Sequence, residues 1–369
     1  MNWWRQLKNN PLAKLGAIIL ITFYCLVILA DFIAPYNPYS TMDNSSLLPP
    51  TTMYWRTIDK QFIGLHVYPT TQGPTSLETG DRLLEVDYEK PAPIKLFAKG
   101  EPYQLGQIKL LLPPKFEEVE IFSGWKFDRH LFGTGNDTRI NLLGTDEQGR
   151  DQLSRLLYGG RISLFIGLIG ILISFPLGMF VGGIAGYFGG WIDSVLMRFV
   201  EVLMTIPGIY LLVSLAAVLP PSLSSGQRFF LIILITSFIS WSGLARVIRG
   251  QVLAIKEQEF VQSAKAIGAN PIYIVIRHIL PQTATYVIIS ATLAIPSFIV
   301  AESVLSLIGL GIQQPDPSWG NLLSISTNAS IIVLQPWLVF SPAILIVLTV
   351  LSFNLLGDGL RDALDPKNN

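Results

Sequence analysis

The chain has 369 residues; half of them are apolar, only 14% are charged, and 26 basic residues balance 26 acidic ones. A soluble domain carries roughly 25% charged residues, so the composition excludes an ordinary soluble protein and indicates that lipid surrounds much of the chain. A net charge of zero gives no basic field that could hold nucleic acid.

Six apolar segments are long enough to cross a membrane. A bilayer core about 30 Å thick takes roughly 20 apolar helical residues. We expect transmembrane helices at Leu15 to Ala34, Ile162 to Ala185, Val200 to Leu219, Phe229 to Val247, Tyr286 to Ile308 and Pro336 to Leu356. The first segment follows Arg5, Lys8 and Lys14, as the core of a signal peptide would. It is longer than such a core and no small-residue cleavage pattern follows, so we interpret it as a retained helix.

Basic residues predict how these helices are oriented, because short cytoplasmic loops are enriched in Lys and Arg. If the N-terminus is cytoplasmic, the inner segments carry Arg5, Lys8, Lys14, Arg198, Arg246, Arg249, Lys256, Lys265, Arg277, Arg361 and Lys367, whereas the short outer loops carry only Arg228. This asymmetry predicts that both termini lie inside. Residues 35–161 then form an external insert between the first and second helices.

The insert is predicted to be rich in β-structure. Its β-favouring runs are separated by Pro and Gly, and they lie at Phe62 to Val67, Arg82 to Tyr88, Ile94 to Ala98 and Val119 to Phe127. Its carboxylates are not paired with a His, Ser or Cys at a catalytic spacing. We therefore interpret it as a structural or docking module.

The end of the insert, Leu143 to Ile162, combines turn signals with charge. A short amphipathic helix there would turn Leu153, Leu156 and Leu157 toward the protein. It would turn Arg150, Asp151 and Arg155 toward water. The segment is then either a solvated approach to the membrane or a docking surface at the outer mouth, formed by Asp146, Arg150 and Asp151.

The cytoplasmic loop, residues 249–283, is predicted to hold two short helices that meet at a corner. The first helix carries an apolar stripe of Phe260, Val261, Ala264 and Ile267, and Glu257 and Glu259 lie in its first turn. Gly268 can end it with a positive φ, and Asn270 followed by Pro271 can start the second. The second stripe is Ile272, Val275, Ile276 and Ile279, after which Pro281 is expected to close this helix and open the fifth span. The corner could rest on lipid headgroups or could be gripped by a protein that moves the spans.

From Phe260 to Pro281 this loop resembles the coupling signature of the integral membrane subunits of ABC importers. That signature reads Glu-Ala-Ala, three residues, Gly, nine residues, Ile, one residue, Leu-Pro. The corresponding positions here are Gln262, Ser263, Ala264, Gly268, His278, Leu280 and Pro281. Gln262 can hydrogen-bond but cannot form an ion pair. Other stretches resemble the C-type permeases of dipeptide and oligopeptide importers, namely Leu143 to Leu168, Gly186 to Met197, Ala301 to Gly320 and Leu356 to Pro366.

The resemblance implies an all-α polytopic protein of a bacterial inner membrane, with six helices, both termini inside and the β-rich external insert. Its parts would be residues 1–34, 35–161 and 162–366. Two cytoplasmic ATPase subunits would dock at the loop through Glu259, Gln262, Ser263, Ala264, Gly268, Leu280 and Pro281. A homologous second permease would complete a heterodimeric pore, and an extracytoplasmic binding protein would deliver the solute.

No catalytic chemistry is expected of the chain itself. It has no phosphate-binding Gly-x-x-x-x-Gly-Lys-Ser/Thr loop, so ATP would be hydrolysed by the partners. Cys25 is the only cysteine, and three dispersed histidines lack metal-ligand spacing, so neither a disulfide, a metal nor a cofactor is predicted. The resemblance favours di- or oligopeptides as the solute, with nickel, glutathione or another small solute as alternatives. A secondary transporter should show internal repeats, which we do not find, and a receptor or scaffold would not need an ATPase.

Charged residues within spans are costly and are candidate functional groups. Glu302 could face the pore together with Ser303 and Ser306, or it could be bonded to neighbouring backbone near the outer interface. Pro176, Pro207, Pro296 and Pro342 are expected to kink their helices. Glycines of the second span, Gly167, Gly170, Gly178, Gly182 and Gly183, are expected to allow close helix packing.

Overall fold

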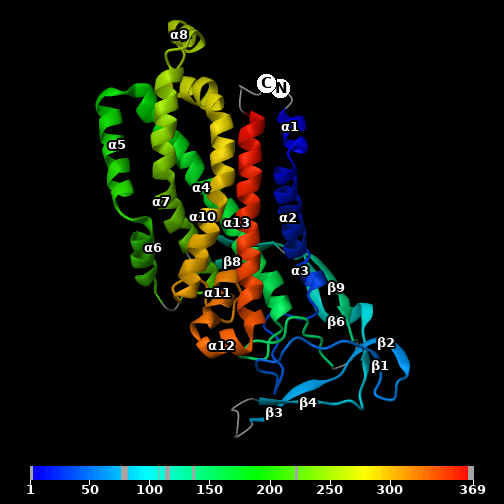
Figure 1. Cartoon of the computed structure of the whole chain (residues 1–369). Helices are drawn as coiled ribbons and strands as arrows, with labels where there is room; N and C mark the ends of the chain where they lie inside the picture. The colour runs from blue at the N-terminus through cyan, green and yellow to red at the C-terminus, as the bar shows by residue number, and fades with distance from the viewer. Residues whose placement is uncertain are drawn as a thin grey trace.

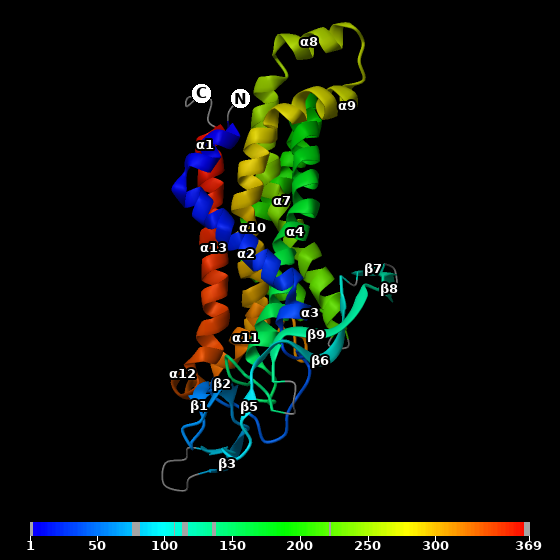
Figure 2. The same ribbon diagram turned by 90° about the vertical axis from the view of Figure 1, so that its right-hand side faces the viewer.

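A bundle of long helices with a β-rich region at one end makes up the protein (Figures 1 and 2). The computed structural model describes residues 3–75, 82–106, 108–112, 117–134, 138–220 and 223–364. The long helices are α2 (Pro11–Ile28), α4 (Gln152–Phe188), α7 (Ser225–Ile255), α10 (Ala284–Leu307) and α13 (Pro336–Leu364). In the described residues five helices are long and apolar enough to cross a membrane, or up to six if one bent pair counts as a span.

The bent pair occupies the predicted third span. It consists of α5 (Gly190–Thr205) and α6 (Gly208–Ala217), and the chain bends by 80° between them. Pro207 lies at the break and has no N–H to continue the helical ladder, whereas its carbonyl accepts hydrogen bonds from Tyr210 N and Leu211 N at the start of α6. The expected kink at Pro207 is confirmed, and it is sharp enough to divide the segment into two helices.

The first span begins earlier than the hydropathy indicated. The side chain of Asn10 caps α2 by accepting hydrogen bonds from Leu12 N and Ala13 N, each at 3.1 Å, and Pro11 occupies the first helical position. A short helix, α1 (Trp3–Asn9), precedes this cap, and another, α3 (Ala30–Ile33), follows a break at Leu29. The predicted segment Leu15 to Ala34 is therefore divided between α2 and α3.

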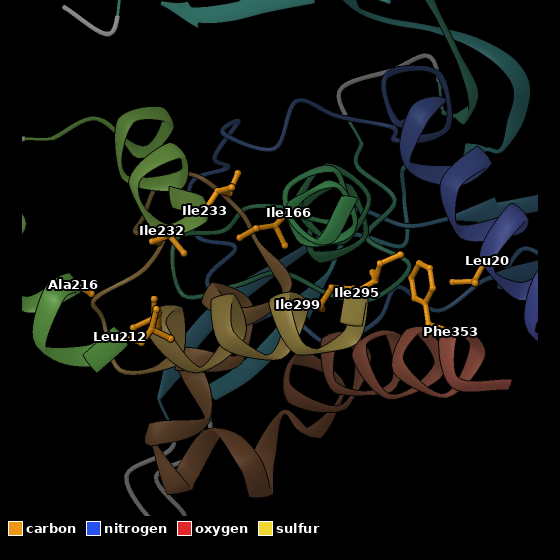
Figure 3. Close-up of a cluster of buried hydrophobic side chains, with 10 residues drawn as sticks. Leu20, Ile166, Leu212, Ala216, Ile232, Ile233, Ile295, Ile299 and Phe353 are labelled. Carbon is orange, nitrogen blue, oxygen red and sulfur yellow. The ribbon is translucent and has the colours of Figure 1, made fainter. Parts of the chain in front are cut away.

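Six helices meet in one apolar cluster. Figure 3 shows it with Leu20 of α2, Ile166 of α4, Leu212 and Ala216 of α6, Ile232 and Ile233 of α7, Ile295, Ile299 and Leu305 of α10, and Phe353 of α13. The bend between α5 and α6 is what allows α6 to reach this cluster. Close packing of these side chains holds the helices together through many small dispersion contacts, since helices surrounded by lipid gain little hydrophobic free energy when they associate.

A row of glycines brings α4 against α7. Gly178, Gly182 and Gly186 lie one turn apart on α4, so they share one face. A Cβ at Gly178 would lie 2.8 Å from the carbonyl oxygen of Trp241, and one at Gly186 would lie 2.8 Å from that of Arg249. A Cβ at Gly182 would meet the carbonyl oxygen of Ala245 still more closely. The prediction that the glycines of this span serve close packing is confirmed.

Replacing Gly182 with alanine should therefore destabilise the protein by about 1–3 kcal/mol, because the added methyl group would force α4 and α7 apart. The midpoint of thermal unfolding in detergent measures the change. Gly250→Ala is the matched control: Gly250 lies in α7, and nothing lies within 4 Å of the place that its added methyl group would take. That change should leave stability unaltered or slightly increased, since alanine is the better helix former. Equal midpoints for the two variants would contradict the close-packing explanation.

The insert contains the strands. They are β1 (Tyr54–Arg56), β2 (Phe62–Val67), β3 (Thr70–Thr75), β4 (Arg82–Val86), β5 (Ala92–Pro93), β6 (Lys95–Leu105), β7 (Ile108–Leu112), β8 (Glu117–Phe122) and β9 (Trp125–Gly133). In the described residues they pair antiparallel as β1-β2-β5, β3-β4, β6-β9 and β7-β8. The run predicted at Phe62 to Val67 coincides with β2. The run predicted at Val119 to Phe127 is wrong as one strand, because Gly124 adopts a φ of +69° and separates β8 from β9.

Candidate functional site

The corner that the sequence predicts at residues 249–283 is present. The helix α8 (Glu259–Ala266) follows α7 and projects beyond the other helices, at the end of the bundle where both termini lie and opposite the strands (Figures 1 and 2). Gly268 takes a φ of +77°, and the carbonyl of Ala264 accepts a hydrogen bond of 3.1 Å from Ala269 N. These features end the helix and reverse the chain, as the glycine predicted.

The second arm of the corner is part of a longer helical segment. Asn270 caps α9 (Pro271–Ile274) by accepting a hydrogen bond of 2.9 Å from Ile272 N, which confirms the predicted start. The chain then stays helical to Leu307, through a wide turn, η1 (Val275–Ile279), and a tight turn, η2 (Leu280–Thr283). The expectation that Pro281 closes a separate helix is wrong. The change of hydrogen-bond pattern around Pro281 accommodates its missing N–H without breaking the segment.

The apolar residues of the corner divide into two groups. Val261, Ala264, Ile274 and Ile279 are buried and pack with Ile248 and Val252 of α7. Val275 is buried as well, whereas five further residues are exposed: Phe260 by 39%, Ile267 by 85%, Ile272 by 50%, Tyr273 by 54% and Ile276 by 53%. We call this exposed group the elbow surface. The predicted stripes are therefore only half buried, because α8 stands away from the bundle and one side of it has no neighbour in the described part of the chain.

The polar signature positions bond within the corner. Gln262 Nε2 donates to the carbonyl of Lys256 at 3.0 Å and to Glu257 Oε2 at 3.3 Å. Ser263 Oγ donates to the carbonyl of Glu259 at 2.8 Å. Gln262 thus ties α8 back to the end of α7, a local role for which an amide donor is suited and a carboxylate is not. The structure brings Glu259, Gln262 and Ser263 to the exposed side of α8 and leaves Leu280 half-buried.

At the other end of the bundle, a buried charge network joins the insert to α4. Asp146 pairs with Arg150 at 2.7 Å and lies 3.3 Å from Arg155 Nε. Gln314 Oε1 accepts hydrogen bonds from both arginines, at 2.7 and 2.8 Å. The expectation that Arg150, Asp151 and Arg155 face water is wrong, since they are 3%, 1% and 0% exposed. Gln314, the partner of the two arginines, lies about 160 residues further along the chain, which is why the local pattern did not indicate that the arginines are buried.

Asp151 caps the first turn of α4. Its Oδ2 accepts hydrogen bonds from the backbone N and the hydroxyl of Ser154, both at 2.7 Å, and its Oδ1 has no hydrogen-bond partner among the described residues. Burial raises the pKa of Asp151 to about 6, although the bonds from Ser154 and the charge of Arg139 act in the opposite direction. The native state therefore binds a proton more readily than the unfolded chain does.

This shift predicts a pH dependence of stability. Between about pH 4 and about pH 6 the native protein holds a proton on Asp151 that the unfolded chain has released, so the free energy of unfolding should fall as the pH rises through this window. Asp151→Asn should remove that slope, since the amide keeps the cap but does not titrate. The variant should match the parent at about pH 4 and exceed it by at most about 3 kcal/mol above pH 6. Unfolding midpoints over this pH range measure the effect, and parallel profiles would contradict it.

Glu302 is enclosed between α10 and its neighbours. It is 0% exposed, and its two carboxylate oxygens accept hydrogen bonds from Ser306 Oγ at 2.7 Å and from Ser163 Oγ of α4 at 3.3 Å. Ser163 Oγ also accepts from Trp319 N at 3.0 Å, at the start of α11 (Trp319–Leu323). Ser303 bonds instead to the carbonyl of Ile299. The partners of Glu302 are serine hydroxyls, which position α10 against α4 and α11; a role in the solute pathway stays a prediction.

A cavity of about 610 Å³ opens between α6, α7, α10 and α13. Its polar lining consists of Thr236, Ser240, Ser297 and Asn354, and most of its other lining residues are apolar. The hydroxyls of Thr236 and Ser240 bond to carbonyls one turn earlier in α7. These residues were missed from the sequence, because they are scattered over three helices that lie far apart in the chain and no spacing relates them across those helices.

After α11 the chain forms η3 (Ser324–Thr327) and α12 (Ala329–Leu334), which lead into α13. Gln314 Nε2 donates to Asn321 Oδ1 of α11 at 3.0 Å. The charge network and the serine cluster around Glu302 therefore both end on α11. This short helix joins the outer charge network to the helix bundle.

The sequence is similar to those of known proteins. Residues 174–369 match the family described as binding-protein-dependent transport system inner membrane component, and residues 2–50 match the N-terminal TM domain of oligopeptide transport permease C. The chain is 43% identical to the oligopeptide transport system permease protein OppC of Haemophilus influenzae, over 62% of this chain and 71% of the relative. It is 45% identical to the dipeptide transport system permease protein DppC of Bacillus subtilis, over 61% and 68%. It is 42% identical to the glutathione transport system permease protein GsiD of Escherichia coli O6, over 68% and 82%.

Proposed function

Since the chain belongs to the family of binding-protein-dependent transport system inner membrane components, we propose that it forms half of the pore of an ATP-driven importer for di- or oligopeptides. The membership makes the chain a multi-pass permease subunit of a bacterial inner membrane and a transporter component without an ATPase site of its own. The pore arrangement, the docking residues and the solute are the parts that we propose.

The observation that carries the coupling proposal is the elbow surface. It is apolar and exposed, and its residues lie on α8, at the end of α8 and at the start of the segment Pro271–Leu307, so the surface spans the connection between α7 and that segment. An ATPase that binds this surface could move both spans, because helices transmit displacement along their axes. We propose that Glu259, Gln262, Ser263, Ala264, Gly268, Leu280 and Pro281 shape this contact, with the buried members acting through the fold of α8. ATP would be bound and hydrolysed by two such partners, and this chain would bind no cofactor.

The two ends of the bundle differ, and this difference supports one orientation in the membrane. The elbow and both termini lie at one end of the bundle, and the strands lie at the other (Figure 1). We propose that the elbow end is cytoplasmic, because it carries the predicted excess of Lys and Arg. The insert, residues 35–161, would then be an external part that meets the binding protein, while residues 1–34 and 162–366 would form the membrane part with the coupling loop at 249–283.

A second permease would complete the pathway. The cavity between α6, α7, α10 and α13 has polar groups at membrane depth that one chain leaves open on one side, and a homologous subunit could close it. We propose Ser240, Ser297 and Asn354 as pathway residues in addition to Glu302, Ser303 and Ser306. Asp146, Arg150 and Asp151 are buried, so their part in an outer docking surface would be to hold the loops around them.

The relatives' names indicate the solute. Peptide permeases are among them at 43% and 45% identity, which supports di- or oligopeptides. A glutathione permease at 42% identity covers a larger share of this chain, 68%, and supports glutathione as the second candidate. Both solutes are peptide-like molecules with a free carboxylate, so the two proposals differ in size and side chains rather than in chemical class.

Uptake by the assembled transporter tests the proposal. The chain, its partner permease, the ATPases and the binding protein would be reconstituted in vesicles with ATP supplied on the ATPase side. Radiolabelled dipeptides, longer peptides, glutathione and Ni²⁺ would be compared. ATP-dependent accumulation of peptides confirms the first candidate and accumulation of glutathione alone favours the second. Accumulation without ATP, or of none of these solutes, would contradict an ATP-driven peptide importer.

A further inference from the structure

The strands β6 and β9 form a long ribbon that is attached to the end of the first span. The His130 ring of β9 lies with Nδ1 2.6 Å from the carbonyl oxygen of Ala34, and the rings of Phe97 and Phe32 pack with centroids 6.0 Å apart. Phe32 belongs to α3, directly after the membrane helix α2. The ribbon therefore starts at the level where the first span leaves the hydrocarbon region.

The ribbon then runs beside the bundle and not away from it. Both views place β6 and β9 near the height of α3; Figure 1 places β8 near the height of α6, and Figure 2 places the β7–β8 end above α11, to the side of the long helices. By contrast, β3 and β4 lie beyond the ends of all the long helices (Figure 1). The two parts of the insert are thus at different depths relative to the spans.

One face of the ribbon is apolar at one end and cationic at the other. Trp125 and Phe127 share a face because they are two residues apart in β9, and they are 64% and 47% exposed. Their partners across the ribbon are Leu105 and Tyr103. Further along the same face Lys99 lies directly opposite Arg129.

Neither end of this face is suited to bulk water. Exposed indole and phenyl rings lose the free energy that burial of apolar area would give, and like charges directly opposite each other in a ribbon are destabilising. Asp128 lies 3.8 Å from Lys99 and offsets part of this repulsion, but both side chains of the pair are exposed to solvent. Aromatic rings beside lysine and arginine are the combination found at membrane surfaces, where the rings enter the interface and the cations meet phosphate groups.

We propose that the β6–β9 ribbon lies on the outer surface of the bilayer, with Trp125 and Phe127 in the lipid interface and Lys99 and Arg129 at anionic headgroups. The lipid is favoured over a protein partner because the ribbon continues from a span that lipid already surrounds. The anchor fixes the near part of the insert at the membrane, while the β1-β2-β5 and β3-β4 sheets stand further out. This inference depends on the membrane position of the helices and on no particular solute.

Site-specific spin labels in the assembled transporter test this placement. Cysteines would replace Trp125 or Phe127 in a Cys25→Ser background, and the protein with its partners would be placed in lipid discs that contain phosphatidylglycerol. Collisions with oxygen, which enriches in lipid, and with a water-soluble nickel chelate would be compared. Trp55 and Phe62 of the β1-β2-β5 sheet are the matched controls, since they are 62% and 71% exposed and carry similar rings.

The ratio of oxygen to nickel collisions should be about threefold or more higher at the ribbon positions than at the controls, as expected for side chains buried in the headgroup boundary. Discs without phosphatidylglycerol should lower this ratio. Equal ratios at ribbon and control positions would overturn the proposal. Low collision rates with both reagents at Trp125 would also overturn it, because they would show that a protein covers the ribbon. ATP-dependent uptake by the same labelled samples shows that they are assembled, whichever result is obtained.

Discussion

Replacing Gly268 with valine should abolish ATP-dependent uptake and the association of ATPase subunits, while the chain still enters the membrane. Gly268 has a φ of +77°, a conformation that costs an ordinary L-residue about 1–2 kcal/mol and a β-branched residue more. In the described part of the chain nothing lies within 4 Å of a methyl group at this position, so it is the backbone conformation that opposes the change. A relaxed backbone would redirect α8 and remove the elbow surface from its place. Uptake into vesicles, co-purification of the ATPases and the amount of chain in the membrane fraction measure the three effects.

Two further variants separate the effect of the backbone conformation at Gly268 from the effect of adding a larger side chain. Gly268→Asn adds a side chain of comparable volume, but asparagine tolerates the left-handed conformation, so it should retain a substantial part of the uptake. Gly250→Val adds the same valine one helix earlier, at a position with open space and no positive φ, and should leave ATPase association intact. Normal uptake by Gly268→Val would contradict the coupling proposal.

Replacing Asp146 with asparagine should destabilise the protein by about 3–5 kcal/mol, because two buried arginines would lose their shared anion. Arg150 and Arg155 are 3% and 0% exposed, and Asp146 is their common carboxylate. Asp146 Oδ1 also accepts hydrogen bonds from the backbone N of Gln148 and Arg150, which the amide oxygen of asparagine can still accept, so the expected loss comes from the missing charge. The thermal unfolding midpoint of the purified chain in detergent measures the effect.

The matched control is Asp128→Asn on the exposed ribbon. Asp128 pairs with Lys99 at 3.8 Å, and both side chains are largely open to solvent. Surface ion pairs contribute little, so this variant should unfold at the temperature of the parent. If Asp146→Asn also unfolded at the temperature of the parent, the charge network would not contribute to the stability of the fold, and the prediction would be wrong.

The corner at residues 249–283 was predictable because its signals are local. A positive φ at Gly268, the cap at Asn270 and the start at Pro271 each follow from the chemistry of one or two residues. Where the prediction was wrong, at Pro281, the outcome depended on how the segment packs against α7, which keeps the chain helical through a wide and then a tight turn.

The apolar stripes of the corner also show that a local pattern does not predict how a segment packs. Periodicity indicated which residues of α8 and α9 share a face, but only the position of α8 relative to the bundle decided that Val261 is buried and Ile267 is exposed. The elbow surface is thus a tertiary feature that is built from residues with a local pattern.

Composition and hydropathy determined by themselves that this protein has long apolar helices, where most of them lie, and that its polar residues concentrate between the first two. These properties depend on the free energy of transfer of each segment into lipid, which is nearly a sum over its own residues. Tertiary structure alone decided that Arg150 and Arg155 are buried, that Glu302 lies among serines, and that α6 bends back into the core. Those outcomes depend on partners far away in the chain: a charge or hydroxyl can be buried only where the fold supplies its counterpart, and no local pattern shows where that counterpart will be.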